Sequence, residues 1–145
     1  MQTIDTFHDF SASRDAIWSL LADFGNIQRW WPPSLAVDID HVEIEGNGVG
    51  MIRHIYNVGF PSAVSEQLLS IDPSSYSFSL AIVNDRPAGV VKYIASGKLS
   101  IVDGGKCRLS YRGEFETEPG REQEARDFFN AAYAMMFTGL AKATS

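Results

Sequence analysis

Polar and apolar residues alternate along most of the chain, and this period of two predicts a protein built mainly of β-strands. Short segments rich in glycine, proline or serine, such as "GNGVG", "DPSS" and "DGGK", separate the alternating stretches, as turns do. The alternation is cleanest in the last stretch, which indicates an antiparallel sheet with one covered and one solvated face. The expected strands are residues 1–10, 36–45, 51–58, 63–71, 75–83, 90–102 and 107–118.

A first region of helical spacing follows the first strand and covers residues 11–26. Ser13 is a good N-cap residue, and Asp15 complements the helix dipole in the first turn. The apolar face of this helix is formed by Ile17, Leu20, Leu21 and Phe24. The prolines at 32 and 33 then restrict the next segment to a short second helix or a turn.

A long helix is expected at the end of the chain, over residues 121–145. It is charged at its start and apolar nearly all round from Phe128 to Leu140, so something large has to bury it. The covered face of the sheet is the element of suitable size. We therefore expect one α+β domain, residues 1–145, in which a strongly curved antiparallel sheet of about seven strands surrounds the C-terminal helix.

Composition narrows the functional classes. The chain has 145 residues, a formal net charge of −6 and a pI near 4.9, which does not suit a nucleic-acid binder. No apolar stretch is long enough to cross a bilayer, so membrane insertion is not expected. One cysteine, Cys107, excludes an internal disulfide and suits a reducing compartment, so we expect a cytoplasmic protein that is a monomer or a homodimer.

Metal and cofactor chemistry find little support in the sequence. The three histidines, at positions 8, 41 and 54, lack the mutual spacing of metal ligands, and no CxxC or HExxH motif occurs. The glycine-rich "GNGVG" leads into a strand rather than a helix, so it offers no helix N-terminus to a phosphate. We expect neither a metal nor a cofactor.

Small residues on one strand raise the question of an internal hollow. Ala95 and Gly97 lie in the inward register of the strand at 90–102 and are too small to reach the helix. Two interpretations are open at this point. Either the helix approaches the sheet closely here, since protein interiors are normally dense, or a cavity is left unfilled.

Two charged residues favour the cavity. Arg53 shares a strand face with Ile55, and Glu66 shares one with Leu68, so both charges point inward if those faces are covered. Buried charges need partners, which would be each other, a tyrosine at 93 or 111, or trapped water. An apolar chamber with a few convergent polar groups is typical of a small-molecule site. The alternatives are a structural ion pair without a ligand, or a register slipped by one that exposes Arg53.

The sequence also resembles a known superfamily over essentially its whole length. Its markers are "SASRDAIWSLLADFGNIQRWWPP", "GNGVGMIRHI", "SEQLLSIDPSSYSFSL" and "VKYIASGKLSI", in that order. They resemble the START and birch-pollen-allergen (SRPBCC) superfamily of helix-grip proteins, and within it the polyketide cyclase/dehydrase-type lipid-transport branch. The resemblance implies a helix-grip fold that holds a hydrophobic ligand between sheet and helix.

A loop within this pattern resembles the gate of the plant abscisic-acid receptors. In "VGFPSAVSEQL", residues 58–68, Phe60 and Pro61 of a gate loop at 57–63 would close the cavity mouth, with residues 84–89 as the facing loop. An ordinary hairpin whose Phe60 packs on the C-terminal helix is the alternative. The ligand-contacting residues expected from the pattern and the resemblance are Arg53, Ile55, Phe60, Pro61, Glu66, Phe78, Tyr93, Tyr111, Phe129 and Met136.

The hormone receptors hold a ligand carboxylate with a lysine near the second strand, and this chain has none there. Its four lysines, at 92, 98, 106 and 142, all come later. A neutral or weakly polar ligand therefore fits the aromatic lining better than abscisic acid does.

Three functions follow from the sequence. The first is non-covalent binding of a hydrophobic molecule such as a lipid or a polyketide. The alternative is an enzyme of the polyketide cyclase, dehydratase or aromatase kind, in which Arg53 polarises a carbonyl while Glu66 or Tyr93 exchanges protons. Glu66 could act as a base only if it is free of Arg53. A third is a protein-interaction module with Phe60 as an exposed anchor.

Overall fold

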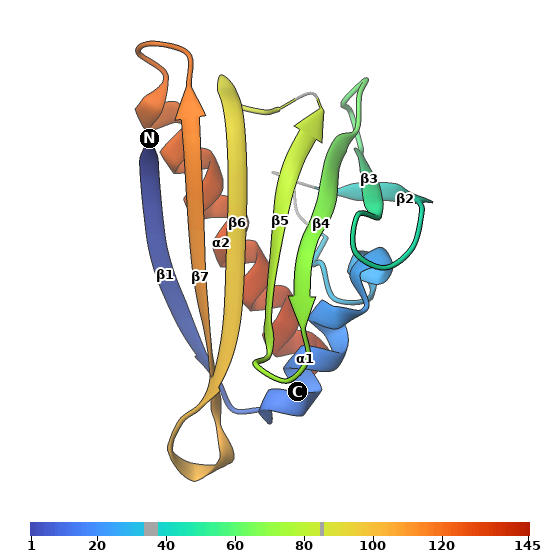
Figure 1. Ribbon diagram of the computed structural model, residues 1–145, viewed down its shortest axis with the longest axis vertical. Coiled ribbons are helices and arrows are strands. Elements are labelled where there is room, and N and C mark those ends of the chain that lie inside the picture. The colour runs from blue at the N-terminus through green and yellow to red at the C-terminus, as the bar shows by residue number, and fades with distance from the viewer. Residues whose placement is uncertain (34–37, 85) are drawn as a thin grey trace.

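Seven antiparallel strands form one curved sheet, and a long C-terminal helix, α2, crosses its inner face (Figure 1). The computed structural model describes residues 1–33, 38–84 and 86–145. The strand order is β1-β7-β6-β5-β4-β3-β2. The strands are β1 (Gln2–Phe10), β2 (Ile39–Glu45), β3 (Ile52–Asn57), β4 (Val64–Asp72), β5 (Ser77–Asn84), β6 (Val90–Ile101) and β7 (Cys107–Thr117). The predicted fold class is confirmed. Residues 36 and 37 of the expected second strand lie outside the described residues.

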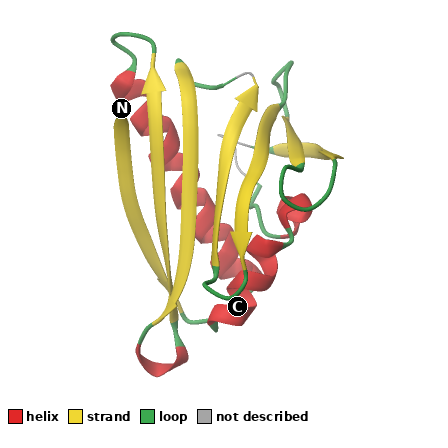
Figure 2. Cartoon of the chain, viewed as in Figure 1, coloured by secondary structure: helices red, strands yellow, loops and turns green. Residues whose placement is uncertain are grey.

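The described residues form two α-helices and two short 3-10 helices, which are red in Figure 2. The helices are α1 (Arg14–Ala22), the 3-10 helices η1 (Phe24–Arg29) and η2 (Asp103–Gly105), and α2 (Glu122–Ala143). Ser13 caps α1 as predicted, because its Oγ accepts a hydrogen bond from the Ala16 N–H at 3.1 Å. The apolar residues of α1, Ile17, Leu20 and Leu21, are buried.

The helix α2 is attached to one half of the sheet by stacked aromatic rings. The Phe129 ring centroid lies 4.2 Å from that of Tyr93 on β6 and 5.1 Å from that of Phe115 on β7. Further along, Phe137 stacks on His8 of β1 with 5.2 Å between centroids. These contacts hold α2 against β1, β7 and β6, and the helix runs obliquely across the sheet, as Figure 1 shows.

Near its C-terminal end α2 approaches another segment closely, at Gly139. A β-carbon at this position would overlap the carbonyl oxygen of Trp30 and lie 2.6 Å from Cδ of Pro32. The segment that follows η1 therefore passes directly against the helix backbone. This contact defines the lower end of the space between helix and sheet, because it leaves no room for a side chain.

Replacing Gly139 by alanine is expected to destabilise the protein by about 1 to 3 kcal/mol, the usual effect of overpacking. The direction of the change in stability is informative, because replacing glycine by alanine at a helix position without such a close contact stabilises a protein by up to about 1 kcal/mol. Urea unfolding measures the effect, with Thr138→Ala at the neighbouring exposed position as the control. A Gly139→Ala variant as stable as the parent would contradict the close approach.

Candidate functional site

A cavity of about 770 Å³ lies between the inner face of the sheet and α2. Its walls come from the inward residues of β3, β4, β6 and β7, from one face of α2 and from the segment Ile27–Trp31. The loops that connect β3 to β4 and β5 to β6 also contribute, through Phe60, Ser62, Pro87 and Ala88. Most of the lining is apolar or aromatic.

Arg53 and Glu66 are the charged pair at the inner part of the cavity. They occupy directly opposite positions on β3 and β4, and Arg53 Nε donates to Glu66 Oε1 at 2.8 Å. Their side chains are 8% and 17% exposed. Arg53 also donates from Nη1 to the Phe24 carbonyl oxygen at 3.0 Å and lies 3.9 Å above the Phe24 ring. The inward register expected from the sequence is confirmed, and the slipped register is wrong. Of the partners that the sequence left open, the structure shows the two charged residues paired with each other.

Three tyrosines form the second polar group of the cavity. The hydroxyls of Tyr93 and Tyr133 are 2.6 Å apart and hydrogen-bonded, and the rings of Tyr111 and Tyr133 meet edge to face with 5.0 Å between centroids. Gly113 makes room for this arrangement, because a β-carbon there would overlap the Tyr133 hydroxyl.

Burial raises the pKa values of these tyrosines. Removal from water raises the pKa of Tyr133 to about 12, and it raises the pKa values of Tyr93 and Tyr111 well above 10. A tyrosine is neutral at pH 7 even with its ordinary pKa, and the shift extends the neutral state of these hydroxyls, which both donate and accept hydrogen bonds, to more alkaline pH.

Asn57 is a cavity residue that the sequence analysis did not include. It ends β3 and follows Arg53 and Ile55 in the same inward register, so the signal was the period of two itself. Its Oδ1 is buried and has no hydrogen-bond partner among the described residues. A buried acceptor without a donor is costly, which makes this atom the unsatisfied polar group of the site.

Other lining residues were also missed. Tyr133 lies four residues after Phe129 and three before Met136, so helical spacing placed it on the same face. Trp30 and Trp31 line the cavity just before the prolines that end the η1 segment. No periodicity could have indicated them, because they belong to an irregular connection.

Most of the residues expected to contact a ligand do line the cavity, and two do not. Those that line it are Arg53, Ile55, Phe60, Glu66, Tyr93, Tyr111, Phe129 and Met136. Pro61 and Phe78 are not among the lining residues. Phe78 is buried beside Gly97, where a β-carbon would lie 2.7 Å from its Cε1 atom. The space beside Gly97 is therefore neither an unfilled cavity nor a place of close helix approach, because the Phe78 ring of the neighbouring strand fills it.

Both loops and α2 contribute residues to the lining of the cavity. Phe60, in the loop between β3 and β4, is 62% exposed and is not buried against the helix. Gly59 before it has a φ of +84°, which glycine adopts without strain. Pro87 and Ala88 of the loop between β5 and β6 also line the mouth. Residue 85 of that loop lies outside the described residues.

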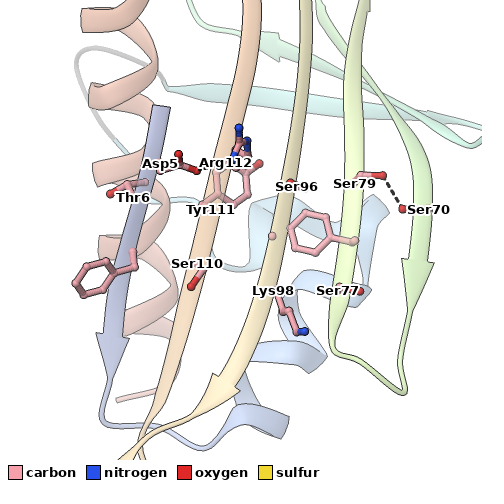
Figure 3. A pocket seen from close by; sticks show the side chains of 13 residues that line it. Asp5, Thr6, Ser70, Ser77, Ser79, Ser96, Lys98, Ser110, Tyr111 and Arg112 are labelled. Atoms are coloured by element: carbon pink, nitrogen blue, oxygen red, sulfur yellow. Dashed lines mark hydrogen bonds and ion pairs between the residues drawn. The ribbon is translucent and has the colours of Figure 1, made fainter. Parts of the chain in front are cut away.

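A second hollow lies on the outer face of the sheet and differs in character (Figure 3). Serine hydroxyls from β4 to β7 surround it, with Lys98 among them. Two pairs of its polar residues contact each other: the hydroxyls of Ser70 and Ser79 are 2.6 Å apart, and Arg112 contacts Asp5 at 3.5 Å. It is an open, solvated surface, so the inner cavity is the candidate site.

Two classes of feature are absent from the described part of the chain. No three histidine, cysteine or carboxylate side chains gather there in a way that could hold a metal ion. Among the same residues, no helix is long and apolar enough to span a bilayer.

Comparison with known proteins shows which family the chain matches and which solved structures resemble it. The family model described as "Polyketide cyclase / dehydrase and lipid transport" matches residues 1–144. No curated protein matches the chain. Many solved structures do, including XoxI from Bacillus cereus, with 19% identity and a TM-score of 0.84 over 99% of this chain and 96% of that one.

Two further structures match closely in shape. An uncharacterised protein from Bacillus thuringiensis has 18% identity and a TM-score of 0.83, over 99% of this chain and 98% of that chain. Norcoclaurine synthase from Thalictrum flavum, in complex with dopamine and hydroxybenzaldehyde, has 19% identity and a TM-score of 0.80 over 97% of this chain and 84% of that chain. At these identities the likeness shows the fold.

The buried ion pair generates a prediction on stability. Arg53→Met leaves the carboxylate of Glu66 without its cation and is expected to cost about 3 kcal/mol or more, whereas Arg53→Met with Glu66→Leu should cost less than the single change. Chemical unfolding of both variants measures this. The exposed pair of Arg108 and Asp9, 2.7 Å apart, is the control, and Arg108→Met should cost no more than about 1 kcal/mol.

The tyrosines generate a prediction on pH. The folded state holds the Tyr133 proton up to a pKa of about 12, while an unfolded chain releases it near 10, so this stabilisation is fully present below pH 10 and is lost as the pH rises toward 12. Tyr133→Phe should therefore weaken the fall of the unfolding free energy over this interval. Urea unfolding at successive pH values tests it, and parallel pH curves for parent and variant would contradict it.

Proposed function

Because the chain belongs to the polyketide cyclase/dehydrase and lipid-transport family, we propose that it binds a hydrophobic small molecule in the cavity between sheet and α2. The observation that carries the proposal is the space itself. A volume of about 770 Å³ lies within the range of roughly 300 to 1,000 Å³ of small-molecule sites. Apolar walls with a few polar groups converging from separate strands are the usual composition of such a site.

The loop at 57–63 is proposed to be the gate of this cavity. Phe60 is a large apolar side chain held in solvent at the mouth, a position that gains free energy if the ring folds over a bound apolar ligand. The neighbouring Gly59 allows the loop to change its backbone angles at low cost. Pro87 and Ala88 supply the opposite rim.

Binding is favoured over catalysis by the state of Glu66. The enzyme alternative needs this carboxylate as a free base, but it accepts a hydrogen bond from Arg53 at 2.8 Å. Arg53 in turn donates to the Phe24 carbonyl oxygen as well as to Glu66, so its guanidinium is already anchored on two sides. The tyrosine hydroxyls are neutral and suit the orientation of a ligand.

Filling the cavity tests the proposal. Ala132 lines the cavity from α2, and the preceding Ala131 is exposed on the same helix. A tryptophan at position 132 would therefore occupy the cavity, whereas a tryptophan at position 131 would lie in solvent. We expect Ala132→Trp to reduce binding of the neutral fluorescent probe 1-N-phenylnaphthylamine at least about tenfold, and Ala131→Trp to leave it nearly unchanged. Fluorescence titration measures both.

Two outcomes would contradict the proposal. One is a parent protein that does not bind the probe, and the other is equal binding by the two tryptophan variants, which would place the probe outside the cavity. Native mass spectrometry of gently purified protein adds an independent readout. A co-purified small molecule that Ala132→Trp excludes and Ala131→Trp retains would support the same conclusion.

A further inference from the structure

Two acceptor oxygens of the cavity lining, Asn57 Oδ1 and Glu66 Oε2, have no donor among the described residues, and Glu124 and Asp127 add carboxylates to the same lining. We propose that the ligand is an apolar molecule, uncharged or cationic, that carries a hydroxyl or amino donor for Asn57 Oδ1, and that the cavity discriminates against carboxylates. This inference rests on the proposed function, since it names the chemical class that the same cavity would take. Three independent features carry it.

The first feature is the unsatisfied amide of Asn57. Its Oδ1 is buried in the cavity wall beside the gate loop and accepts no hydrogen bond from the described residues. Nearly all buried polar atoms in proteins have a partner, so an orphan atom in a binding cavity indicates where a partner belongs. A carbonyl-type oxygen can only accept, and the missing group must therefore donate.

The second feature is that the cation of the cavity is already used. Arg53 is the one cationic side chain among the described residues that line the cavity. It donates to Glu66 and to the Phe24 carbonyl oxygen, and its guanidinium lies against the Phe24 ring. A ligand carboxylate would have to compete with Glu66 for it. The other oxygen of Glu66, Oε2, accepts no hydrogen bond from the described residues and adds a second free acceptor to the wall.

The third feature is the charge at the mouth. Glu124 and Asp127 of α2 both line it. Glu124 is neutralised by Arg121, whose Nη2 lies 2.7 Å from its Oε2. Asp127 accepts only a neutral amide hydrogen bond from Gln123, at 2.8 Å, and no cation among the described residues pairs with it. An entering anion therefore meets uncompensated negative charge, in a protein whose net charge is −6.

Together these features favour donors over acceptors along the whole path. A hydroxyl or amine satisfies Asn57 and passes Asp127 without repulsion, and the aromatic walls suit a cation as well as a flat neutral molecule. A carboxylate gains no free cation, is repelled at the mouth and must lose its hydration in an apolar chamber. Discrimination between these classes then comes mainly from the groups that would be left unpaired.

Four pyrene derivatives test the inference, because they share one ring system and differ in the attached group: 1-hydroxypyrene, 1-methoxypyrene, 1-pyrenemethylamine and 1-pyrenecarboxylic acid. Fluorescence titration at neutral pH gives their dissociation constants. We expect 1-hydroxypyrene to bind about tenfold more tightly than 1-methoxypyrene, the effect of one satisfied hydrogen bond. The amine should bind at least as tightly as 1-hydroxypyrene, and the carboxylate most weakly of the four.

Two variants assign the preference to residues. Asn57→Leu should reduce the hydroxy-to-methoxy ratio from about ten to about two or less. Tyr56→Phe, on the outer side of the same strand, should preserve it. Asp127→Asn should strengthen carboxylate binding and weaken amine binding about two- to threefold each. Glu122→Gln, an equal charge change at an exposed position of α2 outside the lining, should alter both less.

The outcomes separate the inference from the proposed function. Equal affinities for the hydroxy and methoxy compounds, or a preference for the carboxylate, would overturn the inference while cavity binding stands. Binding of none of the four, in a protein that also fails to bind 1-N-phenylnaphthylamine, would remove the proposed function and the inference together. If Asn57→Leu does not fold, the comparison of Asp127→Asn with its control Glu122→Gln still tests the charge preference.

Discussion

Two opposite charges face each other across β3 and β4, inside a chamber whose walls are mostly apolar, and the site is organised around this pair. Burial of either charge alone would cost several kcal/mol, so Arg53 and Glu66 can occupy their positions only together. Their direct opposition in the strand register makes the 2.8 Å contact possible. The Phe24 carbonyl oxygen and ring hold the guanidinium from the side of η1, so the pair also joins the sheet to the first helical segment.

The hollow lies between α2 and the inner face of the sheet, where side chains of both form its walls. Aromatic stacking fixes the helix over β6, β7 and β1, and the contact at Gly139 fixes its C-terminal part against Trp30 and Pro32. The sheet then curves past the helix toward β3 and β4, whose inward side chains face the cavity. Packing is dense where rings from neighbouring strands meet, as at Gly97.

The period of two and the helical spacing predicted much of the structure from the sequence, and there are physical reasons why they did not predict the rest. The period of two placed Arg53 and Glu66 inward, and the charge on them required a partner, so the pair could be foreseen. The same period and the helical spacing also indicated Asn57 and Tyr133, which were missed because neither residue type is costly to bury on a strand or helix face. The location of the empty space could not be foreseen from Gly97, since whether a small residue leaves a void depends on the ring of Phe78, which reaches over it from the next strand.

The polar groups of the cavity also bear on what the chamber can do with a ligand. Arg53 and Glu66 are hydrogen-bonded to each other, and so are the hydroxyls of Tyr93 and Tyr133 at 2.6 Å, so each of the groups best suited to proton transfer has one partner before a ligand enters. The amide of Asn57 is the group left with an unmet requirement, and it is near the mouth rather than beside the ion pair. Because an amide orients a ligand without exchanging protons with it, this distribution favours a chamber that holds a molecule over one that transforms it.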